Sequence, residues 1–473
     1  MLRALTMLRT IALLALPFLT AAACGGSTTD APAADSEGST PDAAAARGSS
    51  ATDDAGGPAT GGDADAGAGP TVLFPRTGIG PDELAVIVND SDALSVQVAA
   101  YYIAKRNIPA ANVIHVTLAS RATMSEADFT PIKANVDAAL ATTKAQAQLL
   151  TWTKPFAVGN MSITSAFAMG YHAIVGSTCT DPYAQSLAAN PYLQKPMSTA
   201  PFTDLAFRPT MTLPATTLAE AQAIVDHGVA ADDTQPKGTA YLMDTTDQTR
   251  SARCILDPSH GYYNECQSLL NELDTASSGI AASIVTANSV KNAADVLFYV
   301  QGLSSVPDIT TNTYLPGAIA DHLTSFGGQI PTSGQMSAFE FLRAGATGSY
   351  GTVVEPCAYV QKFPNPAVLV PRYFGGATLI EAYWKSVEWP AEGIFIGEPL
   401  ARPFGTGYAS KVDGDTLTIA TTAMVPGTQY LVEAADAEAG PFTTVRDNLM
   451  VQKYQRSTFT FPATRKVYRF RQH

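Results

Sequence analysis

Short apolar runs alternate with amphipathic stretches along most of the chain. The run 84–88 has the length and the branched side chains of a buried strand. Behind it, Val96, Ala99, Ala100 and Ile103 recur at the spacing of one helix face. This alternation of strands and helices predicts an α/β fold with a largely parallel sheet.

The pattern divides the α/β part into two tandem three-layer halves, residues 71–215 and 216–405. Strands are expected at 84–88, 113–118, 149–158, 239–243, 280–286, 296–300, 318–323 and 351–354, and helices at 131–144, 218–227, 264–273, 337–344 and 378–389. The pair His227-Gly228 is expected to end a helix, because histidine suits the negative end of the helix dipole and glycine adopts the left-handed cap.

Beyond Gly405 the apolar positions alternate with period two, and Pro-Gly and Gly-Pro pairs mark turns. This predicts a small antiparallel β-sandwich over residues 406–473, which resembles the fibronectin-III-like C-terminal modules of secreted bacterial proteins. Its strands are expected at 416–419, 429–433, 443–445, 458–461 and 467–470. The basic residues near the C-terminus are expected on a solvated edge strand or in contact with an acidic polymer.

Residues 1–24 have the order of a secretory signal: Arg3 and Arg9, the apolar run 11–19, and small residues before Cys24. Small side chains that end in cysteine resemble the bacterial lipobox, in which the cysteine is lipidated. A lipid anchor on Cys24 is therefore expected, with the membrane as partner. The alternative is ordinary signal-peptidase cleavage after Ala-x-Ala, with the cysteine incidental.

The charge of the chain is concentrated behind this signal. Asp+Glu number 42 and Lys+Arg 29 among 473 residues, so the net charge is −13. Residues 25–70 contain eight acidic residues, one arginine, and no Leu, Ile, Val or aromatic residue, which predicts a disordered acidic linker. An acidic chain of this kind argues against nucleic acid as a partner.

Several catalytic motifs are missing. The sequence has no G-x-G-x-x-G after the first strand, no G-K-[ST], no H-E-x-x-H and no C-x-x-C, so neither a nucleotide cofactor nor a metal is expected. Thr347-Gly348-Ser349-Tyr350-Gly351 mimics a nucleophile elbow, but only His473 lies downstream of that serine. Ser349 is therefore expected to be a turn residue.

Polar residues follow successive strands of the second half, where ligands of α/β sheets bind. They are Asp244, Gln301, Asp321, His322, Ser325 and Glu355. An Asp-His pair beside a hydroxyl has the ingredients of base-activated nucleophile chemistry. We expect Asp321, His322, Ser325 and Glu355 as candidate catalytic residues, and Asp244 and Gln301 as candidate binding residues. The alternative is that all six are cap and turn groups.

Residues 84 to about 404 resemble an uncharacterised family of secreted bacterial proteins. The resemblance is carried by the blocks 88–91, 321–328, 345–357, 381–386 and 396–400. The strand order and the closing Gly397-Glu398-Pro399 are also similar in layout to gingipain-like, caspase-related cysteine peptidases. Those peptidases carry a His-Gly and a Cys at neighbouring strand tips, and both are absent here, so the resemblance implies the fold without the thiol mechanism.

Beyond Cys24, the expected mature body contains four cysteines, which suggests two disulfides in an exported protein. Cys254 and Cys266 share a short loop and are the expected pair, which leaves Cys179 for Cys357. Cys357 as a nucleophile is the alternative.

Two functions remain open from the sequence. The first is a cell-envelope lipoprotein, on the outer membrane and facing the periplasm or the cell surface. Its gingipain-like body would be a non-standard or degenerate hydrolase that binds peptide or glycan at the strand tips. The second is a non-catalytic adhesion or scaffold protein. Convergence of the tip residues favours the first, and scattered tips favour the second.

Overall fold

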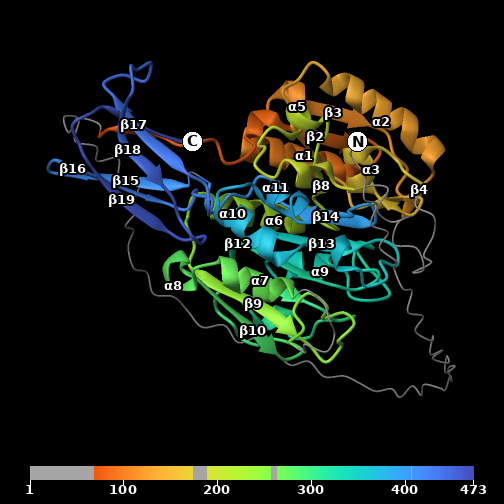
Figure 1. Ribbon diagram of the computed structural model, residues 1–473. Helices are drawn as coiled ribbons and strands as arrows, with labels where there is room; N and C mark the ends of the chain where they lie inside the picture. The colour runs from red at the N-terminus through yellow and green to blue at the C-terminus, as the bar shows by residue number, and fades with distance from the viewer. Residues whose placement is uncertain (1–68, 174–188, 257–263, 406, 473) are drawn as a thin grey trace, which may run out of the picture. The chain divides into compact units, whose positions relative to one another are not determined.

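The computed structural model describes residues 69–173, 189–256, 264–405 and 407–472. The signal segment 1–24, nearly all of segment 25–70 and Cys179 lie outside these ranges. The described chain has a mixed α/β fold, as the sequence predicts (Figure 1). None of its described helices is long and apolar enough to cross a membrane.

Ten strands form one central sheet, which runs from green β10 and β9 to orange β2 and β3 in Figure 1. Its strands in spatial order are β10 (Ile280–Thr286), β9 (Gly238–Asp244), β11 (Val296–Gln301), β12 (Tyr314–His322), β13 (Gly348–Thr352), β14 (Gly393–Gly397), β8 (Thr210–Thr212), β5 (Ala147–Leu150), β2 (Leu84–Asn89) and β3 (Val113–Val116). Neighbouring strands are parallel except for β13 and β14. The two expected halves thus share a single sheet and meet where β14 pairs with β8, and the strand direction reverses within the second half, between β13 and β14.

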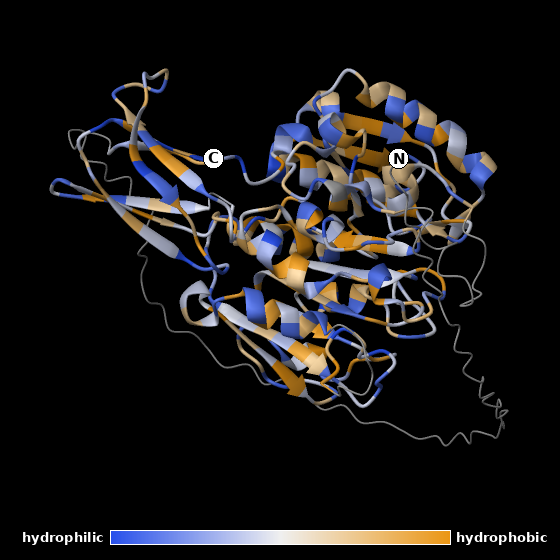
Figure 2. Cartoon of the chain, viewed as in Figure 1, coloured by the Kyte–Doolittle hydropathy of each residue, from blue (hydrophilic) through white to orange (hydrophobic). Residues whose placement is uncertain are grey.

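Helices and short strands complete the α/β body. The α-helices are α1 (Ala93–Arg106), α2 (Glu126–Leu140), α3 (Ile163–Met169), α5 (Pro201–Leu205), α6 (Leu218–Ala231), α7 (Glu265–Glu272), α8 (Thr275–Ser278), α9 (Phe339–Arg343), α10 (Pro366–Phe374) and α11 (Leu379–Trp384). The 3-10 helices are η1 (Pro81–Glu83), η2 (Ala110–Asn112), η4 (Pro191–Gln194), η6 (Ile309–Thr311) and η7 (Val360–Lys362), and a small sheet contains β4 (Thr123–Met124), β6 (Ala157–Val158) and β7 (Met161–Ser162). Figure 2 shows hydrophobic residues along the central strands and mixed residues along α2, as expected for a buried sheet under amphipathic helices.

Two predicted boundaries move for local reasons. α2 begins before the expected start at Pro131, because the Ser125 hydroxyl accepts the N–H of Asp128 at 3.2 Å and caps an earlier first turn. The expected strand 149–158 is interrupted, since β5 ends at Leu150 and the chain pairs again only after Pro155, which has no N–H to donate.

α6 continues through Gly228 to Ala231, so the expected helix end at His227-Gly228 is wrong. Glycine has a packing role here instead, because a Cβ at this position would come within 2.7 Å of the Glu398 side chain. The His227 imidazole, whose pKa is lowered by burial, forms a hydrogen bond with the backbone of Gly345.

Two further sheets form what we call the two-sheet region, residues 71–73 and 408–472. The first sheet has the order β1 (Thr71–Leu73), β20 (Val467–Gln472), β17 (Tyr430–Ala435), β18 (Thr443–Leu449), and the second β15 (Tyr408–Asp413), β16 (Thr416–Thr421), β19 (Ser457–Pro462). Both contribute to a separate hydrophobic core. β20 lies between β1 and β17, so it is not the edge strand that the sequence predicts.

Candidate ligand site at the strand tips

β9, β11, β12 and β13 are parallel, so their carboxyl ends lie at one edge of the sheet. The register pairs Val300 with Asp321 and Gln301 with His322. Parallel pairing therefore brings the expected tip residues of these strands to the same edge.

Asp321 and His322 are adjacent on β12 and face opposite sides of the sheet. Asp321 Oδ1 lies 2.6 Å from Nη2 of Arg253, and both side chains are buried. Burial raises the pKa of Asp321, and the Arg253 guanidinium partly offsets this rise. Asp321 is thus an ion-pair partner of Arg253 rather than a group directed at His322.

Arg253 connects several segments at this edge. Its Nη2 donates to the carbonyl oxygen of Gln301 at 2.9 Å, and Nη1 donates to the carbonyl oxygen of Pro364 at 3.0 Å. The guanidinium therefore joins the ends of β11 and β12 to the segment before α10.

Glu265, the first residue of α7, adds a second carboxyl group to this buried cluster. Burial raises its pKa to about 8, and the negative charges of Asp321 and Glu388 add to the rise while Arg253 opposes it. Its Oε2 has no hydrogen-bond partner among the described residues. Burial therefore favours the protonated form of Glu265.

His322 is fully buried on the other face of β12, against the ring of Phe341 at 5.5 Å between centroids. Nε2 lies 3.1 Å from the carbonyl oxygen of Met336, which can only accept, so Nε2 carries the proton. Burial lowers the pKa of His322 to about 3, and the positive charges of Arg253 and Arg250 contribute. The imidazole is therefore neutral and held by the core.

Ser325 and Glu355 form hydrogen bonds that hold the nearby backbone in place. The Ser325 N–H donates to Oε1 of Gln335 at 3.0 Å, and its carbonyl oxygen accepts from the Thr352 hydroxyl at 3.0 Å. Oε1 of Glu355 accepts the N–H of Cys357 at 2.8 Å. Both residues fix the turns that follow β12 and β13.

Asp244 and Gln301 also have local partners. Asp244 Oδ1 accepts from Nε2 of Gln248 at 3.2 Å, and Gln301 Nε2 donates to the carbonyl oxygen of Asn288 at 2.9 Å. Within the described ranges, no side-chain hydrogen bond or ion pair joins any two of the six expected tip residues. They share a sheet edge without forming a contiguous set of catalytic groups.

A cavity of about 350 Å³ lies between the loops that follow β9 and β13. It is lined by Gln248, Thr249, Ala252 and residues 357–361. Amide, hydroxyl and aromatic groups are present in this lining, and no charged side chain is among its described residues. The cavity can hold a neutral polar ligand, and its described lining contains no histidine, aspartate or glutamate to act as a general base.

Cys254 and Cys266 form the expected disulfide, with 5.0 Å between their Cα atoms. Cys357 is also disulfide-bonded, and its expected partner Cys179 lies outside the described residues. Cys357 is therefore not available as a thiolate nucleophile in this structure.

Sequence reasoning missed Arg253 and Glu265, although each directly precedes a cysteine of the first disulfide. The bonded cysteines hold the two side chains near each other, and the N–H of Cys266 donates to the carbonyl oxygen of Arg253 at 3.1 Å. The signal in the sequence that could have predicted this ion-pair cluster was a basic and an acidic residue, each next to a cysteine of the expected disulfide.

Gly351, in the block 345–357, is required because the backbone of Gly327 and Gly328 passes very close to it. A Cβ on Gly351 would lie 2.4 Å from the carbonyl carbon of Gly327 and 2.5 Å from the nitrogen of Gly328. The blocks 321–328 and 345–357 therefore meet where two backbones touch. Ser349 lies inside β13, fully buried, and is not the turn residue that the sequence predicts.

Comparisons with known proteins do not identify a family for this chain. No protein-family model matches the chain, and no curated protein matches it. A solved structure named "Structure of Protease" aligns with a TM-score of 0.36 and 8% sequence identity, covering 84% of this chain and 98% of that one. A likeness at this level defines neither the fold nor an activity.

Proposed function

We propose that this protein is an envelope lipoprotein whose α/β body binds a neutral glycan in the cavity between the β9 and β13 loops, without hydrolysing it. The observation that carries the proposal is the cavity of about 350 Å³, whose described lining has no charged side chain. The separation of the candidate catalytic groups argues against hydrolysis there. Asp321 is paired with Arg253 on one face of β12, and His322 is neutral and buried on the other.

Hydrolysis would need a base that reaches a nucleophile or a water. His322 has its Nε2 proton engaged by Met336, and its pKa of about 3 opposes protonation at neutral pH. Glu265 is buried and is not among the residues that line the cavity, so it does not reach a ligand there. A body of this kind is a degenerate hydrolase in the sense the sequence suggests.

The preference for a glycan over a peptide comes from the cavity lining. Neutral sugars are recognised through amides, hydroxyls and aromatic rings. The lining contains Gln248, Thr249, Gln361 and Tyr359, and the Lys362 ammonium lies 5.7 Å from the centroid of the Tyr359 ring. A peptide with charged groups would meet no opposite charge from the described lining.

The finer architecture belongs to the same proposal. We propose that the body is gingipain-like, with two halves joined through β14 and β8, and that the two-sheet region is a fibronectin-III-like sandwich. The continuous sheet, in which β14 of the second half pairs with β8 of the first, and the shared core of the two sheets support this view.

The test is calorimetric titration of the full chain with neutral oligosaccharides and with synthetic peptides. Tyr359→Ala should weaken oligosaccharide binding by about tenfold, as expected for an aromatic contact in a site. Tyr101→Ala, a half-buried tyrosine on α1, is the matched control and should leave binding unchanged.

Chromatography of the titrated oligosaccharides should recover them uncleaved. Cleavage products, or binding of peptides alone, would contradict the proposal. Binding of neither class would favour the scaffold function instead.

A further inference from the structure

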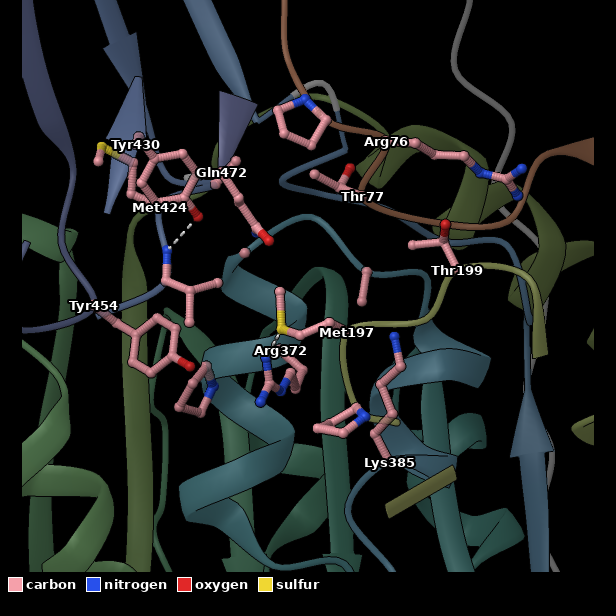
Figure 3. Close-up of a pocket in the computed structure, with 17 residues that line it drawn as sticks. Arg76, Thr77, Met197, Thr199, Arg372, Lys385, Met424, Tyr430, Tyr454 and Gln472 are labelled. Carbon is pink, nitrogen blue, oxygen red and sulfur yellow. Dashed lines mark hydrogen bonds between the residues drawn. The ribbon is translucent and has the colours of Figure 1, made fainter. Parts of the chain in front are cut away.

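A second cavity lies where the α/β body meets the two-sheet region, and its lining shares no residue with the cavity at the strand tips (Figure 3). Its volume is about 70 Å³. Arg76, Arg372 and Lys385 line it, and no Asp or Glu is among the described residues of its lining. Arg76 is paired with Glu83 and Lys385 with Glu381, so Arg372 is the cation of this lining that has no ion pair among the described residues.

Arg372 lies in the last turn of α10, next to Met197 in Figure 3. Its Nη1 donates to the Met197 sulfur at 2.9 Å. A thioether sulfur is a weak acceptor, whereas a guanidinium carries five N–H donors. Across the described ranges, no carboxylate forms an ion pair with Arg372, so most of its hydrogen-bonding capacity is available to a ligand.

Lys385 is the second cation, and its side chain is 3% exposed. Its Nζ lies 3.5 Å from Oε1 of Glu381, an oxygen that also accepts the Tyr192 hydroxyl at 3.2 Å. Burial lowers the pKa of Lys385, and the charge of Arg372 lowers it further, while Glu381 opposes both effects. Arg372 and Lys385 therefore lie within electrostatic range of each other, with Glu381 acting on Lys385 and Glu272 within electrostatic range of Arg372.

The remaining walls are mostly apolar or aromatic, with Pro371, Met424, Tyr430 and Tyr454 among them. Tyr430 is fixed by its hydroxyl, which accepts the N–H of Val425 at 3.1 Å. A volume of 70 Å³ holds about five water-sized groups. It is large enough for a carboxylate or a phosphate, and too small for a sugar ring.

We propose that this cavity binds a small oxyanion, a carboxylate or a phosphate, between Arg372 and Lys385. A guanidinium beside an ammonium in a low-dielectric pocket is the donor set that such anions prefer. Because residues of both the body and the two-sheet region line the cavity, a bound anion also strengthens the contact between them. This inference does not depend on glycan binding at the strand tips.

Calorimetric titration of the full chain with sodium phosphate and, separately, with sodium propionate tests the proposal, with sodium chloride at equal ionic strength as reference. Saturable binding is expected for at least one of the two anions, and the comparison shows which one the site prefers. Arg372→Gln should weaken it by about tenfold or more, and Arg372→Lys by less. Arg343→Gln is the control, since Arg343 also ends a helix but is paired with Glu220 and Glu340.

Arg372 is only partly buried and has no carboxylate partner in the described chain, so its variants should keep the native circular dichroism spectrum. Equal binding by wild type and Arg372→Gln would overturn the proposal. So would the absence of any heat beyond that of chloride with both anions.

Discussion

At the residue scale, Glu265 and His322 have opposite effects on stability as the pH changes. Burial raises the pKa of Glu265 from 4.5 to about 8, so between these values the folded chain keeps a proton that the unfolded chain releases. Stability therefore falls as pH rises through that window, by up to about 1.4 kcal/mol per pH unit. Burial lowers the pKa of His322 from 6.5 to about 3, so stability falls as pH drops below 6.5.

The two effects oppose each other between pH 4.5 and 6.5, whereas only that of Glu265 acts between 6.5 and 8. Glu265→Gln should remove the loss of unfolding free energy between pH 6.5 and 8, because glutamine cannot titrate. Urea unfolding at several pH values measures this. Glu126→Gln, at an exposed position on α2, is the control. Identical slopes for wild type and Glu265→Gln would show that Glu265 is charged in the folded chain.

The positions of the tip residues could be predicted from the sequence, because parallel strands end at one edge. The hydrogen-bond and ion-pair partners of these residues could not be predicted from the sequence. Arg253 reaches Asp321 and Gln301 from a loop distant in sequence, and the alternation of side chains on β12 separates Asp321 from His322. The hydrophobic pattern along the chain predicts where strands end. It does not predict which buried basic side chain pairs with which buried acidic one.

At the element scale, Glu398 joins segments that are far apart in sequence. Its Oε2 lies 2.5 Å from Nη2 of Arg106 on α1, and its Oε1 accepts the Tyr102 hydroxyl at 2.6 Å. Arg106 also pairs with Asp232, which follows α6. The Gly-Glu-Pro loop after β14 therefore fastens α1 and α6 to the sheet.

Replacing Glu398 by Gln should lower the free energy of unfolding by about 3–5 kcal/mol, because it leaves the buried Arg106 charge without its main partner. Urea denaturation monitored by circular dichroism measures the change. Lys105→Gln is the control: its exposed pair with Asp226 should matter little. A Glu398→Gln midpoint equal to that of wild type would mean that the ion pair does not stabilise the fold.

Elements with strong periodicity could be predicted, and short or proline-containing ones could not. β10 has the predicted bounds, because its seven residues form a clear β-rich run. α10 was not predicted because it contains Pro366 and Pro371, and proline argues against a helix when only the sequence is considered. β14 was not predicted because its apolar run is only three residues long and lies between two glycines.

At the scale of the whole molecule, β1 belongs to the two-sheet region although the sequence assigns residue 71 onward to the α/β part. β1 pairs with β20 in parallel, and Phe74 stacks on Phe470 at 4.2 Å between centroids. The segment before the body and the C-terminal strand thus complete one sheet. Sequence periodicity could not reveal this, since a three-residue strand has too few positions.

Val72→Asp should destabilise the two-sheet region, because Val72 is 4% exposed and lies in its core. Thr71→Asp, one residue away and exposed, should be tolerated. Limited proteolysis, read by mass spectrometry, should show earlier cleavage within residues 408–472 for the first variant. Equal cleavage of both variants would mean that β1 contributes nothing to that region.

Lipidation of Cys24 remains a prediction from the sequence. Radiolabelled palmitate should enter the protein in a bacterial host, and Cys24→Ser should abolish the label, because acylation requires the thiol. Cys254→Ser is the control, since that residue is in a disulfide. Unlabelled wild-type protein would favour ordinary signal-peptidase cleavage.

β14 is the last strand of the α/β body along the chain, yet it lies near the middle of the sheet, between β13 and β8. Until residues 393–397 are available, β8 and β13 each present unpaired backbone groups. The body therefore cannot close strand by strand during synthesis. Its closure waits for nearly the whole chain, and a product that stops before residue 393 keeps two open edges that promote aggregation.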